Sequence, residues 1–322
     1  MRDEHGMPLS NQVNEKEKLS PGDHSEERAG DAQRARRAFL ALLSGAIGIA
    51  FAPIFVRLSE VGPSATAFYR LFLALPVLSL WRLRERTRLD GSSRLAGSKD
   101  YLQLAVAGLF FAGDLALWHW SIRLTSVANA TLFANFAPIF VTLGARILFL
   151  EEIKIPFLIG LGLALAGAAM VVGNSLRLTA GHLAGDLVGI ATALFYGSYM
   201  LAVKHLRRRF STATIMAGSG LAACPALFLV ALASGEKLFP TQAAGWAVLV
   251  ALALVSQVGG QSLIAYAFAH LPASFSSLSL LLQPAVAALL AWIILAEPLG
   301  LLQAFGGSVI LCGIAMAGRA NR

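Results

Sequence analysis

Long apolar runs recur along almost the whole chain and are separated by short polar stretches. Each run is close to the roughly 20 apolar residues that a helix needs to cross about 30 Å of hydrocarbon. The connections are short, except for one sizeable loop at 82–99. The pattern predicts an all-α integral membrane protein with about ten transmembrane helices, at 39–59, 63–82, 100–122, 126–148, 155–173, 184–204, 212–233, 244–268, 272–295 and 299–318.

Residues 1–37 break this pattern, because they combine many charges of both signs with few apolar side chains. A segment of this composition cannot bury enough apolar surface to fold by itself. It also lacks the apolar core and the cleavage site of a signal peptide. We therefore expect a disordered cytoplasmic tail, followed by an uncleaved first span.

The two halves of the apolar region match each other at a constant shift of 146 residues. Identical residues stand at Gly113 and Gly259, Pro138 and Pro284, Glu151 and Glu297, Gly160 and Gly306, and Gly167 and Gly313. Each half holds five spans, an odd number, so the second half enters the membrane from the opposite side. The sequence thus predicts two inverted five-helix repeats, at 38–175 and 183–318. Secondary transporters often have this architecture and hold substrate near the bilayer midplane between the halves. A duplication that serves only the fold is the alternative.

This combination resembles the EamA-type transporters of the drug/metabolite transporter superfamily. Each repeat has a span with a central Pro, a Glu at the exit of that span and a Gly-rich last span, and "FYRLFLA" carries the arginine that the family tends to have, Arg70. The second repeat has Ala217 or Gly218 near that position, so this mark is missing there. The resemblance covers 39–318. It implies transport of a small metabolite by alternating access, and relatives move amino acids, sugars and nucleotide derivatives.

Composition and charge agree with a membrane protein. The 322 residues are 57% hydrophobic and 14% charged, whereas soluble domains are typically about 25% charged. The net charge of +8 comes from Lys and Arg clusters between spans, which is a topology pattern and not a nucleic-acid-binding face. Sixteen lie on the side of the N-terminus: Arg34, Arg36, Arg37, Arg82, Arg84, Arg86, Arg88, Arg94, Lys99, Lys154, Lys204, Arg207, Arg208, Arg209, Arg319 and Arg322. Four lie opposite: Arg57, Arg123, Arg177 and Lys237. The asymmetry predicts a multi-pass protein of a bacterial inner membrane with both termini cytoplasmic.

The third span contains "GDLALWHW", which puts Asp114 into an otherwise apolar helix. A carboxylate there costs about 2.5–3.5 kcal/mol on insertion scales, so such residues usually have a function. Helix phase places Trp118 and Ser121 on the same face and turns His119 away. We expect Asp114 and Trp118 to contact substrate and Asp114 to carry proton coupling. A structural pair between Asp114 and Arg70, or a bond to a neighbouring helix, is the alternative.

Further polar residues line up at helical spacing in four spans. Pro138 and Pro284 are expected to break helices four and nine, and the polar residues beside them are expected to line the cavity. Polar residues can instead hold helices together, at about 0.6 kcal/mol each, and Tyr199 can serve as an interface anchor. The expected substrate contacts are Thr131, Asn135, Tyr196, Tyr199, Gln257, Gln261, Ser279 and Gln283.

Other residues are interpreted as structural. Arg70, Glu151 and Glu297 belong to this group, and the matching positions of the two glutamates suggest that each caps the next helix. The glycines of the last span in each half are expected to allow close helix packing. His119, Trp120 and Arg123 are typical of a membrane-interface belt.

Several kinds of chemistry have no signature in the sequence. Cys224 and Cys312 lie in apolar runs, so we expect free thiols and neither a disulfide nor a metal site. HExxH, GxSxG and nucleotide-binding motifs are missing, so we expect no enzyme activity and no cofactor. The expected partners are the lipid bilayer, a small-molecule substrate and protons, but no nucleic acid, and the protein is expected to be a monomer or a homodimer.

The sequence thus favours a secondary transporter, and the resemblance to the EamA-type family implies export of an amino acid or another amphipathic compound. A non-transporting membrane sensor or accessory subunit is the main alternative, and a membrane enzyme is the other. A cavity rich in aromatic side chains and poor in charge would suit an amphipathic solute.

Overall fold

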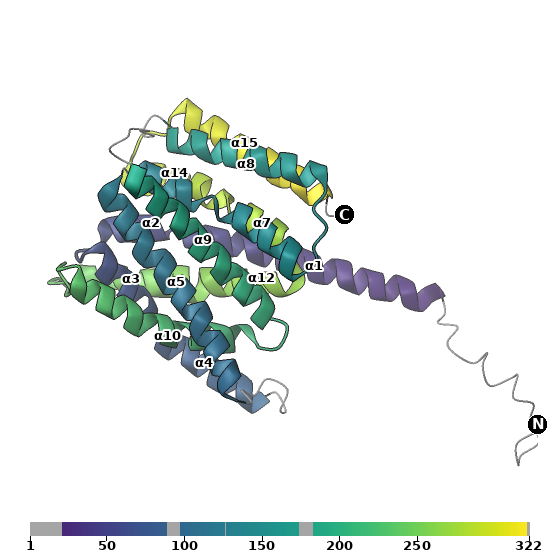
Figure 1. Cartoon of the computed structure of the whole chain (residues 1–322), viewed down its shortest axis with the longest axis horizontal. Helices are drawn as coiled ribbons and strands as arrows, with labels where there is room; N and C mark the ends of the chain where they lie inside the picture. The colour runs from purple at the N-terminus through teal and green to yellow at the C-terminus, as the bar shows by residue number, and fades with distance from the viewer. Residues whose placement is uncertain (1–20, 89–96, 126, 174–182, 321–322) are drawn as a thin grey trace, which may run out of the picture. The chain divides into compact units, whose positions relative to one another are not determined.

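The computed structural model describes residues 21–88, 97–125, 127–173 and 183–320, and these ranges contain helices and no strand. The chain divides into two compact units, Met1–Arg37 and Ala38–Arg322. The helices, labelled in part in Figure 1, are α1 (Pro21–Ala50), α2 (Ala52–Leu58), α3 (Pro63–Phe72), α4 (Leu75–Arg88), α5 (Ser98–Leu124), α6 (Val127–Ala134), α7 (Ala137–Leu148), α8 (Ile155–Val172), α9 (Leu183–Leu206), α10 (Thr212–Ala233), α11 (Ala243–Ala251), the π-helix η4 (Leu252–Gln261), α12 (Ser262–His270), α13 (Ala273–Ser279), α14 (Leu282–Leu295) and α15 (Leu301–Ala320).

Ten helical segments in the described ranges are long and apolar enough to cross a membrane. They run from Ala32–Leu58 to Leu301–Ala320 and match the ten predicted spans within a few residues, except that the first begins earlier. The predicted fold class, an all-α membrane protein of ten spans, is confirmed.

The tail differs in part from the expectation of disorder. Its first twenty residues lie outside the described residues, but from Pro21 onward the chain is helical, as the first part of α1. Ala, Glu, Gln and Arg are frequent between 26 and 37 and have high helix propensity. A proline in the first turn costs no hydrogen bond, because the N–H groups of that turn have no partner inside the helix.

Five of the ten spans are interrupted or wound differently near their middle. Helices α6 and α7 are separated just before Pro138, and α13 and α14 just before Pro284. Two further spans break before Pro53 and Pro76, and the eighth contains the π-helix η4. Each proline lies in or next to the first turn of the second half-helix. Backbone N–H groups there have no partner inside the helix, so a proline costs no hydrogen bond.

The inverted symmetry is visible where the last spans of the two repeats meet. Helices α8 and α15 lie side by side (Figure 1). A Cβ added at Gly160 would stand 2.6 Å from the carbonyl oxygen of Gly313, and one added at Gly167 would stand 2.6 Å from that of Gly306. The start of one helix therefore packs on the end of the other, so the two run antiparallel. The predicted packing role of these glycines is confirmed.

Helix ends gather at two opposite faces of the unit Ala38–Arg322. At one, called here the Arg57 face, Arg57 pairs with Glu297, and the N–H of Gly62 donates to the carbonyl of Lys237 over 3.1 Å. The backbone N–H of Thr241 donates to Glu60 on the same face, and this bond lowers the pKa of that carboxyl.

Three polar contacts define the opposite end of the spans, called here the Glu151 face. Glu151 accepts from the backbone N–H of Ala273 and Ser274, Lys204 Nζ donates to the carbonyl of Leu271 over 2.7 Å, and Arg209 pairs with Asp100. Spans that alternate in direction bring these residues together, as expected for a multi-pass bundle.

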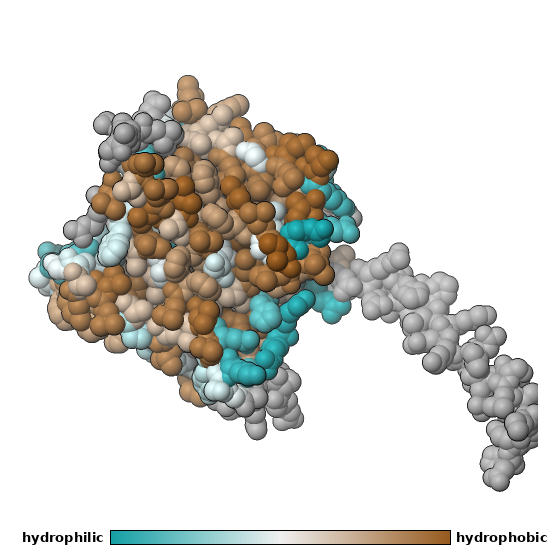
Figure 2. Space-filling model, viewed as in Figure 1, coloured by the Kyte–Doolittle hydropathy of each residue, from teal (hydrophilic) through white to brown (hydrophobic). Residues whose placement is uncertain are grey.

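The outer surface of the bundle is apolar. Figure 2 shows hydrophobic side chains across the viewed face and hydrophilic ones toward its margins. Exposed large apolar residues occur on many helices, among them Leu109, Leu158 and Leu229. In water such a surface would be a liability, and in a bilayer it is the expected lipid-facing boundary.

Replacing Gly167 with Ala is expected to lower the thermal midpoint of the purified protein in detergent. The added methyl group would overlap the backbone of α15, and overpacking of this kind typically costs about 1–3 kcal/mol. Gly162 on the same helix is the matched control, because a Cβ there meets no atom of the described residues within 4 Å. Gly162→Ala should leave the midpoint unchanged or raise it. If both variants melt alike, the close α8–α15 packing is not what stabilises this pair.

Candidate functional site

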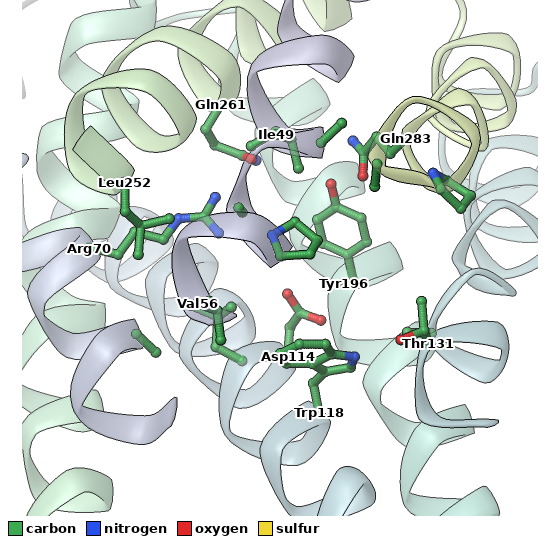
Figure 3. Close-up of a pocket in the computed structure, with 18 of the residues that line it drawn as sticks. Ile49, Val56, Arg70, Asp114, Trp118, Thr131, Tyr196, Leu252, Gln261 and Gln283 are labelled. Carbon is green, nitrogen blue, oxygen red and sulfur yellow. The ribbon is translucent and has the colours of Figure 1, made fainter. Parts of the chain in front are cut away.

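A cavity of about 230 Å³ lies between the two repeats. One water needs about 10–15 Å³ on the same measure, so the space is large enough for a small organic molecule. Helices α1, α2, α3, α5 and α6 line it from the first repeat, and α9, η4 and α14 from the second (Figure 3). Seven of the predicted substrate contacts line it: Asp114, Trp118, Thr131, Asn135, Tyr196, Gln261 and Gln283.

The cavity reaches toward the Arg57 face. Val56 lies two residues before the end of α2 on that face, Thr66 lies in the first turn of α3, and Thr131 is the fifth residue of α6. On the other side, the lining residues nearest the Glu151 face are Tyr196, Gln261 and Gln283, which lie well inside their spans. The cavity is therefore closed by packed side chains on the Glu151 face.

Asp114 points into the cavity without a polar partner. Figure 3 shows its carboxylate directed into the space above Trp118 and beside Tyr196. It accepts no hydrogen bond and forms no ion pair with any residue in the part of the chain that the structure describes. Because an ionised carboxylate without a partner is costly at membrane depth, this position is prepared for a ligand, a water or a proton.

Arg70 projects into the same cavity from α3 (Figure 3). Its side chain is held from behind: Nε donates to Oε1 of Gln257 over 2.9 Å, and the guanidinium carbon lies 5.7 Å from the centre of the Phe111 ring. Within the described ranges no ion pair joins Arg70 to Asp114, so the alternative of a direct structural pair is not what the structure shows. Arg70, interpreted from sequence as structural, lines the cavity.

Aromatic rings form much of the remaining wall. Tyr196 lines the cavity, and Tyr199 stacks behind it with ring centres 6.4 Å apart and interplanar angle 20°. Phe111 stacks on Tyr199 at 4.6 Å, and Nε2 of Gln261 donates to the Tyr199 hydroxyl over 3.3 Å. The rings fix one another, so the wall is rigid and apolar.

The fourth and ninth spans, which break before Pro138 and Pro284, present amide groups to the cavity. Asn135 follows α6 at its break, and Gln283 lies in the first turn of α14. Nδ2 of Asn135 and Nε2 of Gln283 are buried, and neither makes a hydrogen bond of normal geometry to the residues that the structure describes. An unpaired buried donor costs about 1–3 kcal/mol, so an acceptor supplied by a bound molecule would be favoured at both.

Three predicted contact residues do not line the cavity. Tyr199 is buried behind Tyr196, Gln257 accepts from Arg70, and the Ser279 hydroxyl donates to the carbonyl of Phe275 within its own helical turn. Tyr199 and Gln257 support residues that do line it. Of the predicted interface belt, Trp120 is exposed, and the side chains of His119 and Arg123 lie outside the described residues.

The two glutamates have different partners from those expected. Glu151 does cap a helix, but that helix is α13 and not the next helix, α8. Glu297 pairs with Arg57 and caps no helix in the part of the chain that the structure describes. Sequence spacing suggested a cap but could not identify a helix more than a hundred residues away.

Sequence reasoning also missed the wall that the first two spans contribute, which includes Pro53, Val56 and Thr66. A signal was present: the hexapeptide FAPIFV occurs at 51–56 and again at 136–141, and both copies stand at a helix break. A buried arginine in a membrane span was the second signal for Arg70.

The candidate metal ligands and the two cysteines can be placed in the described ranges. No group of three or more His, Cys, Asp or Glu side chains there is placed to hold a metal ion. Cys224 and Cys312 are free thiols, as predicted, the first buried and the second exposed.

Comparisons with known proteins agree on the class. The EamA-like transporter family matches residues 36–173 and again residues 183–319. An uncharacterized transporter of Archaeoglobus fulgidus is 26% identical over 282 residues, covering 87% of this chain and 95% of its own, and the uncharacterized transporter YdfC of Bacillus subtilis is 26% identical over 280 residues, covering 85% and 87%. One crystal structure has a TM-score of 0.73 at 19% identity, over 90% of this chain and 98% of its own, and it supports the fold alone.

Proposed function

Because the chain belongs to the EamA-like transporter family, we propose that it is a secondary transporter that moves a small zwitterionic, amphipathic solute by alternating access. The two matches of the family coincide with the two inverted repeats, and the cavity lies between them. A site between inverted repeats is the usual place for substrate in secondary transporters.

The observation that carries the proposal is the pair of opposite charges facing one cavity without contacting each other. A solute with an ammonium group and a carboxylate can bind Asp114 with the first and Arg70 with the second. Each charge then gains a partner in a site of low dielectric, where charge-assisted hydrogen bonds are strong. A solute with only one of these groups leaves the other side chain uncompensated.

The rest of the wall suits the remainder of such a molecule. Trp118 and Tyr196 offer ring faces for an apolar or aromatic side chain, and rings also attract the ammonium group. The free amide donors of Asn135 and Gln283 can satisfy acceptor oxygens. An amino acid with an apolar side chain has this combination of groups.

We propose that Asp114 also couples transport to protons. A carboxylate that makes no bond to the described residues can accept either a proton or the ammonium group of the solute, but not both. Competition of this kind at one site exchanges solute for protons and would support export. In bacterial and archaeal cells the expected location is the cell membrane.

The Lys and Arg distribution supports an orientation of the bundle with both termini and the Glu151 face in the cytoplasm. In this orientation the Arg57 face is external, and we propose that the state described is the outward-open state of the cycle. Reporter fusions at the C-terminus test this orientation. A reporter that works only outside the cytoplasm should be inactive there, and activity of that reporter contradicts the orientation.

Counterflow in proteoliposomes tests the function. The panel should pair amino acids with their decarboxylated amines and their deaminated acids. We expect exchange of the amino acids and at least tenfold weaker competition by each one-charge analogue, because hydrogen bonds to charged groups contribute about 1.5–3 kcal/mol. If amines or acids compete as well as the amino acids, the zwitterion proposal is wrong. If no solute of the panel moves under any gradient, transport of this class is excluded.

A further inference from the structure

Equivalent positions of the two repeats differ in exposure at the two faces of the bundle. Thr131 and Trp118 line the cavity next to the Arg57 face. Their equivalents in the second repeat, 146 residues later, are Ser277 and Ile264, which are 0% and 2% exposed next to the Glu151 face. One repeat is therefore open where the other is closed.

Contacts of Glu151 hold the closed face together. Its carboxylate accepts from the N–H of Ala273 over 2.6 Å, from the N–H of Ser274 over 3.1 Å and from the Ser274 hydroxyl over 2.6 Å. These groups form the first turn of α13, whose free N–H groups and positive dipole end favour a carboxylate. The contact joins the end of the fourth span to the start of the ninth, 122 residues apart.

Glu297 is presented by the same backbone turn but is bound differently. Leu150 and Ala296, the residues before the two glutamates, are the non-glycine residues with positive φ in the described ranges, at 55° and 54°. The N–H of Glu151 donates to the carbonyl of Ala145, and that of Glu297 donates to the equivalent carbonyl, of Ala291. In both repeats this turn holds a non-glycine residue in a strained left-handed backbone conformation.

The symmetric partner of Glu297 would be the first turn of α6, which corresponds to the first turn of α13. Glu297 makes no bond there within the described part of the chain and pairs instead with Arg57. The side chains of this pair are 63% and 42% exposed, and ion pairs that exposed contribute little. Glu297 is thus free to leave Arg57 at small cost.

We propose that Glu151 and Glu297 are alternating latches of the transport cycle. In the state described, Glu151 caps α13 and closes the Glu151 face. In the opposite state Glu151 releases α13, while Glu297 leaves Arg57, caps α6 and closes the Arg57 face. The proposal rests on the alternating-access function proposed above and assigns the two glutamates as positioning residues of that cycle.

Cysteine labelling in lipid nanodiscs tests the proposed change between the two states. Both faces of the protein are accessible to reagent there, and no solute is needed. Thr131→Cys and Ser277→Cys, each in a Cys224→Ala, Cys312→Ala background, report the two faces at equivalent positions. A hydrophilic maleimide should label Thr131→Cys faster than Ser277→Cys when both glutamates are present.

Glu151→Ala should raise the labelling rate of Ser277→Cys about tenfold and lower that of Thr131→Cys, since loss of a helix cap shifts a two-state balance by roughly that factor. Adding Glu297→Ala should return the Ser277→Cys rate close to its starting value, because it weakens the opposite state. Glu152→Ala, at the exposed neighbour of Glu151, is the matched control and should change neither rate.

Three results would overturn the proposal: an unchanged Ser277→Cys rate in Glu151→Ala, a double variant that labels as fast as Glu151→Ala alone, or a Glu297→Ala variant that raises the Ser277→Cys rate. The last two are expected if both glutamates only stabilise the fold. Thermal melting of each variant verifies folding, and Glu151→Gln replaces Glu151→Ala with the same criteria if the latter does not fold. Since labelling needs no transport, failure of the proposed function in counterflow remains a separate result.

Discussion

Asp114→Asn is expected to abolish pH-driven accumulation of solute in proteoliposomes while leaving counterflow at zero proton gradient measurable. Asn has the shape of Asp but cannot exchange a proton in the physiological range, so a coupled cycle loses its proton step. It also loses the charge that attracts the ammonium group, and apparent affinity for the solute should fall about 10- to 100-fold. Accumulation and counterflow, measured on the same vesicles, separate the two effects.

Asp186→Asn is the matched control for a buried carboxylate that has no place in the cavity. Asp186 accepts from Thr125 Oγ1 over 2.8 Å and from Asn129 Nδ2 over 3.0 Å at the Arg57 face. Its replacement should lower thermal stability and leave the pH dependence of transport unchanged. If Asp114→Asn shows the pH dependence of the unmodified protein, the proton role of Asp114 is ruled out.

Arg70→Gln is expected to remove discrimination by the carboxylate of the solute. Counterflow of amino acids should weaken about 10- to 100-fold, because a charge-assisted bond in a dry site is lost, while a decarboxylated amine should compete as well as before. Arg70→Lys keeps the charge but loses the planar donor group that Gln257 positions, so it should recover part of the affinity.

A purely structural Arg70 gives a different result. In that case Arg70→Gln lowers transport of amines and amino acids by the same factor and lowers the thermal midpoint. Gln257→Leu helps to separate the readings, because it removes the 2.9 Å support of the guanidinium and leaves its charge in the cavity. It should reduce amino-acid affinity less than Arg70→Gln does.

Local chemistry determined much of the architecture directly from the sequence. The ten spans follow from the length of apolar runs, and the inverted repeat follows from a constant shift between identical residues and an odd number of spans per half. The packing role of Gly160 and Gly167 also followed, since small residues at regular spacing allow close helix approach. Helix phase alone placed Asp114 and Trp118 on one face, and both line the cavity.

Only the tertiary structure decided which of these groups meet. Arg70 and Asp114 lie in consecutive spans, but whether they form an ion pair or face one cavity depends on how α3 and α5 pack. The same limit applies to Glu151, whose partner α13 lies in the other repeat. Periodicity and composition describe one helix at a time, whereas distances between helices depend on side-chain volumes and breaks across the whole bundle. The sequence therefore identified the residues whose side chains can bind a solute or a proton, and packing decided which of them share a site.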